Sequence, residues 1–84
     1  MPADSFAIEL QKCLDEYGKS PYRLAADSGV DVGNLHRILH GERQNTTRET
    51  ILRIALGITL TAPQVDEVIV GINRLFDAAG LKTL

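Results

Sequence analysis

The sequence has a single cysteine and no long apolar run, and both absences limit what the protein can be. The only cysteine is Cys13, so an intramolecular disulfide is excluded, and a cytoplasmic protein is the simple interpretation. No apolar run approaches the ~18 residues of a membrane span, and no signal peptide opens the chain. We expect one small domain over residues 1–84, with a modest core.

Net positive charge is also missing. The formal net charge is −2, which argues mildly against a nucleic-acid binder. The distribution of charge matters more than the total. Residues 1–18 have a net charge of −3, residues 19–53 of +2, and the remaining residues of −1. The middle of the chain therefore offers a weak positive surface to a polyanion.

The middle segment, residues 20–41 (SPYRLAADSGVDVGNLHRILHG), predicts two short helices joined by a tight turn. Ser20 is a good N-cap followed by Pro21 at the first helical position, and Gly29 suits the left-handed residue after the helix. Asp31 offers a second N-cap, and Gly41 closes the second helix. The apolar stripe of that helix consists of Leu35, Ile38 and Leu39.

Three further helices are predicted around this pair. The first runs from about residue 4 or 5 to Gly18, with Phe6, Leu10, Cys13, Leu14 and Tyr17 on its buried face. The fourth is capped by Thr46 or Thr47, with a capping box from Thr46 to Glu49, and ends at Gly57. Its predicted buried face comprises Ile51, Leu52, Ile54, Ala55 and Leu56.

The last helix is predicted over about residues 61–79, opened by a capping box from Thr61 to Gln64 and ended by Gly80. Its apolar surface is wider than one packing face needs, which favours a second partner surface and a two-fold homodimer. The alternative is packing on Leu81 and Leu84 of the same chain. The residues expected at the dimer interface are Val65, Ile69, Ile72 and Phe76.

The paired helices identify a family. The pattern is carried by Ser20, Leu24, Ala25, Gly29, Val30, Leu35, Ile38 and Gly41, and it resembles the Cro and phage-repressor type (XRE-type) of helix-turn-helix regulator. The resemblance extends from about Phe6 to Leu60. It implies an all-α, five-helix DNA-binding domain whose second and third helices form the helix-turn-helix. It also implies a sequence-specific double-stranded DNA-binding transcriptional regulator, such as a repressor, with the third helix in the major groove.

The resemblance places the base-contacting positions on Val32, Gly33 and Arg37. An arginine can bond both O6 and N7 of guanine, although Arg37 could also be a phosphate contact or a solvated residue. On a helical wheel the side of the third helix opposite Leu35 is built around these residues. The other expected DNA contacts, to phosphate or base, are Asn34, His36, His40, Arg23, Arg43, Gln44, Asn45 and Arg48.

Two departures from the family pattern stand out. Pro21 occupies the place of a phosphate-binding glutamine and offers no donor itself, but the positive end of the helix remains and Arg23 could substitute. Leu14 and Leu39 replace an arginine–glutamate pair, and we predict that they touch. Asp31 and Glu42 also bracket the third helix with negative charge.

These charges keep a second hypothesis open, a protein-interaction module (an antirepressor-like or scaffold protein) that keeps the fold without binding DNA. An enzyme is not expected, because no nucleophile–base pair and no phosphate-cradling glycine loop is present. His36 and His40 have a metal-compatible spacing but lack a third ligand, so no metal or cofactor is expected.

Overall fold

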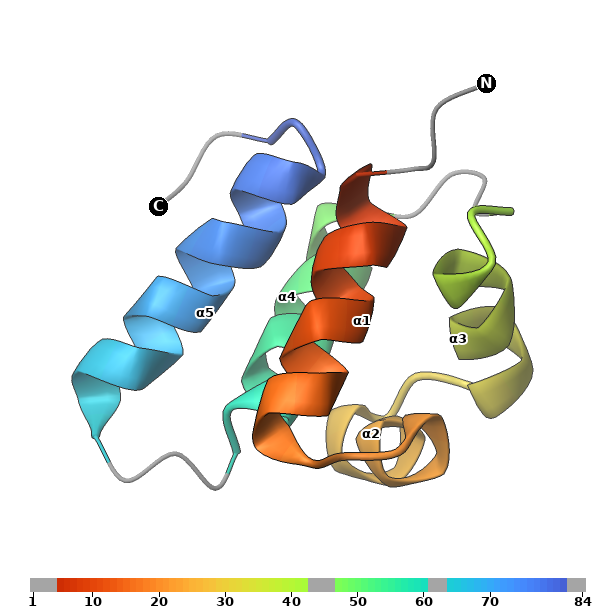
Figure 1. The fold of residues 1–84 in the computed structure, drawn as a ribbon, viewed down its shortest axis with the longest axis horizontal. Helices are drawn as coiled ribbons and strands as arrows, with labels where there is room; N and C mark the ends of the chain where they lie inside the picture. The colour runs from red at the N-terminus through yellow and green to blue at the C-terminus, as the bar shows by residue number, and fades with distance from the viewer. Residues whose placement is uncertain (1–4, 43–46, 61–63, 82–84) are drawn as a thin grey trace.

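The computed structural model describes residues 5–42, 47–60 and 64–81, and within these residues it contains five helices and no strand. The helices are α1 (Ser5–Tyr17), α2 (Pro21–Ser28), α3 (Val32–Leu39), α4 (Arg48–Ile58) and α5 (Val65–Ala78) (Figure 1). The predicted all-α class and the helix-turn-helix of α2 and α3 are confirmed.

The predicted signals at the ends of α2 and α3 are the ones the structure uses. The hydroxyl of Ser20 accepts a hydrogen bond from the amide of Arg23 at 3.1 Å. Gly29 ends α2 with φ of 75°, and its amide donates to the carbonyl of Ala25 at 2.9 Å. The carboxylate of Asp31 then accepts from the amide of Asn34 at 3.1 Å. Local capping therefore sets both helices and the turn between them.

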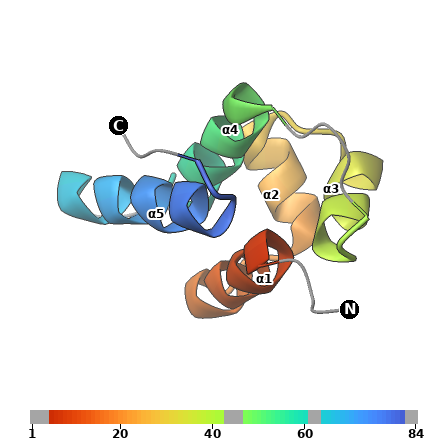
Figure 2. The ribbon, with the colours of Figure 1, turned by 90° about the horizontal axis from the view of Figure 1, so that it is seen from above.

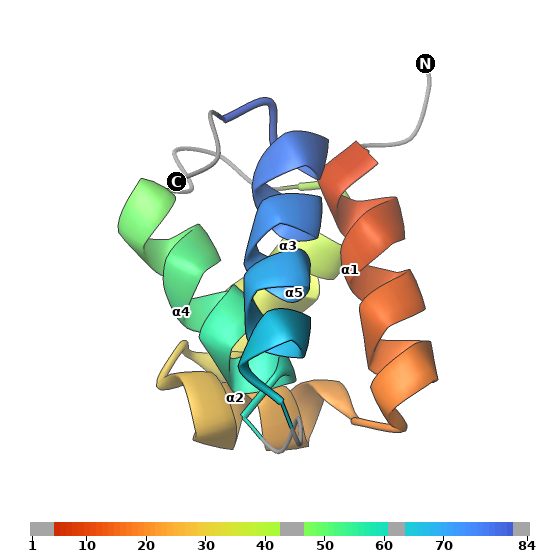
Figure 3. The same ribbon diagram turned by 90° about the vertical axis from the view of Figure 1, so that its left-hand side faces the viewer.

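The core lies where α1 and α4 face each other, with α5 between them on one side and α2 and α3 on the other (Figures 2 and 3). Cys13 is buried in it, and this burial raises the pKa of its thiol, as expected for an inert packing residue. The largest fully buried side chains are Phe6, Leu10, Leu14, Leu24, Leu35, Ile38, Ile51, Ile54, Ile58, Leu75 and Phe76.

The predicted end of α4 at Gly57 is wrong. The helix continues to Ile58, and Thr59 is its C-cap. Gly57 is buried against α2, where an added Cβ would lie 2.8 Å from the Cβ of Ser28. This glycine therefore marks the close approach of two helices and not a helix end. The buried face of α4 shifts accordingly, because Ile58 is in the core while Leu56 is exposed.

Of the two alternative caps predicted for α4, Thr47 is confirmed, and the N-caps of α4 and α5 are other residues than the threonines that begin the two predicted capping boxes. Thr47 is the N-cap of α4, and its hydroxyl accepts from the amide of Thr50 at 3.1 Å. The helix α5 begins only at Val65, and its N-cap Gln64 makes no side-chain capping bond. Thr46 and Thr61, to which the boxes were assigned, lie outside the described residues, as does Leu84.

Candidate nucleic-acid interface

The outer face of α3 is the surface on which a DNA contact can be built. Leu35 and Ile38 point into the core, which turns the opposite side of the helix to solvent. On that side Gly33, Asn34, Arg37 and His40 are exposed, and Val32 and His36 are half-buried. The helix lies at the opposite end of the molecule from α5 (Figures 1 and 2).

Arg37 is the free cation of this face. Among the described residues its side chain has no hydrogen bond and no ion pair. An unpaired guanidinium on an exposed helix keeps all of its donors for an external acceptor. Its position fits the base-reading role that the family resemblance gives it.

The two histidines of α3 bond within the helix. Nδ1 of His40 lies 2.8 Å from the carbonyl oxygen of His36, and the two imidazole rings stack with centroids 6.5 Å apart. The ring of His36 also meets the ring of Tyr22 on α2 edge-on, with centroids 5.6 Å apart. Within the described residues no group of three or more metal-binding side chains forms. His40 is exposed, and His36 lies half-buried beside it.

Asp27 engages two of the cations counted in the positive middle segment. Nζ of Lys19 lies 2.8 Å from the carboxylate of Asp27 and donates to the carbonyl oxygen of Gly57 at 2.7 Å, and its side chain is only 6% exposed. Nε of Arg23 bonds the same carboxylate. These bonds, that of Lys19 above all, lower the pKa of Asp27. Lys19 is thus structural, and Arg23 keeps only its terminal nitrogens for a phosphate.

Arg48 lies against the protein core. Its guanidinium carbon is 4.8 Å from the ring centroid of Phe76, in a cation–π arrangement that joins the start of α4 to α5. The residue is still exposed at the surface. The expected contacts Arg43, Gln44 and Asn45, which precede α4 in the sequence, lie outside the described residues.

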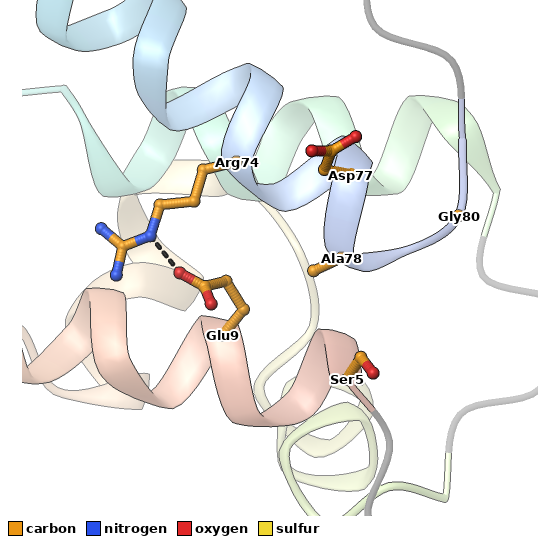
Figure 4. Close-up of a pocket in the computed structure, with 6 residues that line it drawn as sticks. All are labelled: Ser5, Glu9, Arg74, Asp77, Ala78 and Gly80. Atoms are coloured by element: carbon orange, nitrogen blue, oxygen red, sulfur yellow. Dashed lines mark hydrogen bonds and ion pairs between the residues drawn. The ribbon is translucent and has the colours of Figure 1, made fainter.

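Arg74 forms the ion-pair cluster that sequence reasoning missed. Its guanidinium bonds Glu9 and Glu16 of α1 and so joins α5 to α1. The bonds lower the pKa of Glu16 and raise that of Arg74. Figure 4 shows the bond to Glu9 at an open pocket of about 520 Å³, with Ser5 and Asp77 on its rim. Glu9 and Glu16, seven residues apart on one helix face, were the available signal.

The four residues expected at a dimer interface fall into two groups. Val65 and Ile69 are exposed, at 73% and 51%. Ile72 and Phe76 instead belong to the core of the chain itself, Phe76 with no exposed surface at all. They face α1 and α4, so they are not available to a partner while the fold is intact, and this part of the prediction is corrected.

The replacement of an ionic pair by Leu14 and Leu39 fits the packing. Leu14 is buried in the core, and Leu39 packs half-buried against the same cluster. An apolar pair is therefore accommodated at this place, and the direct contact between the two side chains stays a prediction.

Two capped helices joined by a glycine turn, with the second helix facing solvent, define a helix-turn-helix DNA-binding domain. The family model of the Cro/C1-type HTH DNA-binding domain matches residues 9–61, which run from α1 to just beyond α4. The chain therefore belongs to the Cro/C1-type helix-turn-helix family.

The protein is accordingly a DNA-binding regulator, of a family that is typically not enzymatic. Comparison with curated proteins and with solved structures gives no match. The helix α5 lies after the matched segment. In the described parts of the chain, no helix is long and apolar enough to cross a membrane.

Proposed function

We propose that this protein is a cytoplasmic repressor, one domain over residues 1–84, that binds a specific sequence of double-stranded DNA as a homodimer. The α3 helix enters the major groove and reads bases from its first turn and from Arg37. The observation that carries this proposal is the unpaired guanidinium of Arg37 on the exposed face of α3.

Contacts to the DNA backbone would set the position of α3. Arg23 flanks the start of α2 with its terminal nitrogens free of the bond that its Nε makes to Asp27. Asn34, His36 and His40 offer further polar groups on or beside the outer face. Such contacts orient the protein, while the groove contacts of Val32 and Arg37 supply the sequence preference and Gly33 lets the helix approach closely.

The test is selection of binding sites from a random duplex pool, followed by a salt titration on the selected site. Enrichment of a palindrome, with half-sites about one DNA turn (~34 Å) apart and an affinity that falls steeply with salt, supports a dimeric regulator. No enrichment, and no binding at low salt, would instead favour the protein-interaction module, with the carboxylates of Asp31 and Glu42 repelling DNA.

Arg37→Ala tests the base-reading role directly. We expect the dissociation constant for the selected site to rise about 5-fold or more, because one bidentate contact discriminates by about 1–3 kcal/mol, while the thermal stability is unchanged. Arg53→Ala is the matched control, since it removes the same charge from an exposed residue of α4. An unchanged site preference in Arg37→Ala would remove Arg37 as a base reader.

The proposed dimer uses the exposed part of α5. Val65 and Ile69, with Leu60 just before the helix, leave apolar side chains on the surface. Ile69→Asp is expected to give a monomer in sedimentation equilibrium, because a carboxylate would be buried unpaired at the interface. Ile8→Asp is the matched control, an isoleucine of similar exposure on α1. A dimer that survives Ile69→Asp would place the interface elsewhere.

A further inference from the structure

Tyr22 is a large aromatic residue left at the surface. It is the second residue of α2, and 69% of it is exposed. The only other tyrosine, Tyr17, is half-buried against the core. No described residue forms a hydrogen bond with the hydroxyl of Tyr22. The side chain thus has an exposed ring and a donor that the fold itself does not use.

The ring of Tyr22 is nevertheless held in place. It meets the imidazole of His36 edge-on, with an interplanar angle of 69° and centroids 5.6 Å apart. His36 is in turn stacked on His40, whose Nδ1 bonds the carbonyl of His36. The ring of the tyrosine therefore lies beside α3, next to the surface that carries Arg37 and the histidines.

The start of α2 has one amide donor fewer than other helices. Pro21 is the first helical residue and has no N–H, and its side chain offers no polar group. Nearby, the hydroxyl oxygen of Ser20 accepts the capping bond from the amide of Arg23. Tyr22 is the next residue along the chain, and its hydroxyl adds a neutral donor on a longer side chain near this helix start.

We propose that the hydroxyl of Tyr22 donates a hydrogen bond to a backbone phosphate of the bound DNA, beside the half-site that α3 reads. This rests on the proposed function, since it needs α3 at the DNA. Tyrosine hydroxyls are among the groups that bond phosphate oxygens, and a phosphate contact positions the protein without reading sequence. Because His36 already orders the ring, little rotamer freedom is lost on binding.

A neutral donor has a signature that differs from that of an arginine. A hydroxyl adds no charge, so it displaces no counterion, and removing it leaves the dependence of affinity on salt unchanged. It also contacts no base. Its loss therefore weakens binding equally for the selected site and for single-base variants of that site. Arg37→Ala, in contrast, changes the preference at one base pair.

The experiment compares Tyr22→Phe with the wild type in dissociation constants for the selected duplex, at several salt concentrations. The variant removes one oxygen and keeps the ring on His36. We expect an increase of about 3- to 10-fold in the dissociation constant, with an unchanged salt slope and site preference. Tyr17→Phe is the matched control, because it removes the only other tyrosine hydroxyl, on α1. Its affinity should equal that of the wild type.

A methylphosphonate scan of the duplex identifies the phosphate. At one position, the neutral linkage should weaken the wild type and leave Tyr22→Phe unaffected, as expected for two changes that remove one bond.

An unchanged dissociation constant for Tyr22→Phe overturns the proposal, even if Tyr22→Leu weakens binding, because the ring alone would then act through His36. A changed site preference overturns it too. If the wild type binds no duplex, the proposed function fails; if it binds and Tyr22→Phe binds equally, only this inference fails.

Discussion

Two contacts between helices, called seams below, are built differently: that of α2 with α4, and that of α5 with the rest of the protein. Where α2 meets α4, Gly57 lies against the backbone of Ser28, because a Cβ added to Gly57 would be 3.1 Å from the Cα of Ser28. The buried Lys19 bonds Asp27 and the carbonyl of Gly57 at the same place. Where α5 joins the rest, Gly71 faces one methyl of Thr59, and Arg74 is a partly exposed link to α1. The seam that positions the helix-turn-helix thus includes a close approach of two backbones, whereas the contacts of Gly71 and Arg74 at the seam of α5 are with side chains.

Gly57→Ala should have the largest effect. The new methyl would meet Cβ and Cα of Ser28, so α2 must move away from α4, and we expect a net loss of about 2 kcal/mol in the free energy of unfolding. For a chain of this size the loss lowers Tm by roughly 10 °C in calorimetry. Ser28→Gly should not restore stability, since the backbone at this position would still clash with the new methyl. A variant as stable as the wild type would show that α2 can shift freely.

Gly71→Ala is expected to be milder and, unlike Gly57→Ala, reversible by a second change. Its methyl would lie 2.7 Å from Cγ2 of Thr59 alone. We expect a loss of about 1 kcal/mol. Thr59→Ser removes that methyl and keeps the hydroxyl that donates to the carbonyl of Ala55. The double variant should therefore regain most of the lost Tm. If it does not, a neighbour other than the methyl of Thr59 limits this seam.

Arg74→Met should lower Tm by about 4 °C, because partly exposed ion pairs contribute little each and two are lost together. The Tm of the variant is measured by calorimetry at pH 7. DNA affinity should be unchanged, since α3 lies at the other end of the molecule (Figure 1). A loss of affinity without loss of fold would mean that α5 acts on the reading surface.

Acid should weaken both seams through their carboxylates. The pKa of Glu16 is lowered by its bonds to Arg74, and that of Asp27 by its bonds to Lys19 and Arg23. A lowered pKa in the folded state stabilises it above the unfolded values of 4.5 and 3.8, and this stability is lost as the pH falls through the folded values. Unfolding curves of wild type, Glu16→Gln and Asp27→Asn between pH 7 and ~2 should show a smaller acid loss in each variant. Equal losses of stability in all three proteins would show that the carboxylates of Glu16 and Asp27 do not cause the acid sensitivity.

Arg53→Ala should have the smallest effect. Its pair with Glu49 lies within α4, with the arginine side chain 55% exposed. We expect a loss of no more than about 0.5 kcal/mol, measured by urea unfolding. A larger loss would show that Arg53 has a role outside this pair, and it could then no longer serve as a control for Arg37.

The local signals of the sequence were sufficient for most of the helix-turn-helix. Ser20, Gly29 and Asp31 act on residues within four positions, so their roles in capping could be predicted from the chain alone. The meaning of Gly57 depended on Ser28, which is far away in the sequence. A glycine can end a helix or admit a neighbour, and only the packing of α2 on α4 distinguishes the two.

In the candidate site, too, some features follow from local sequence signals and others only from packing between distant residues. The periodicity of α3 indicates which side of the helix faces solvent. It does not indicate which cations are free, because the partners come from other elements. Lys19 is engaged by Asp27 and Gly57, Arg48 lies on Phe76, and Arg37 is left unpaired. Partners on other elements also explain the burial pattern of α5, because packing on α1 and α4 buries Phe76 and leaves Ile69 exposed.

The N-cap of α3 has a consequence for how such a regulator would find its site in a genome. The carboxylate of Asp31 holds the amide of Asn34 at the end of the helix that is proposed to enter the groove. Its negative charge repels phosphate on every sequence alike, so it weakens binding to random DNA. A genome offers about 10⁶–10⁹ competing sites, and occupancy of the right one depends on the ratio of specific to non-specific affinity. Because the repulsion acts at the right site as well, Asp31 would leave this ratio to contacts such as that of Arg37, and would shorten the time spent bound to any DNA.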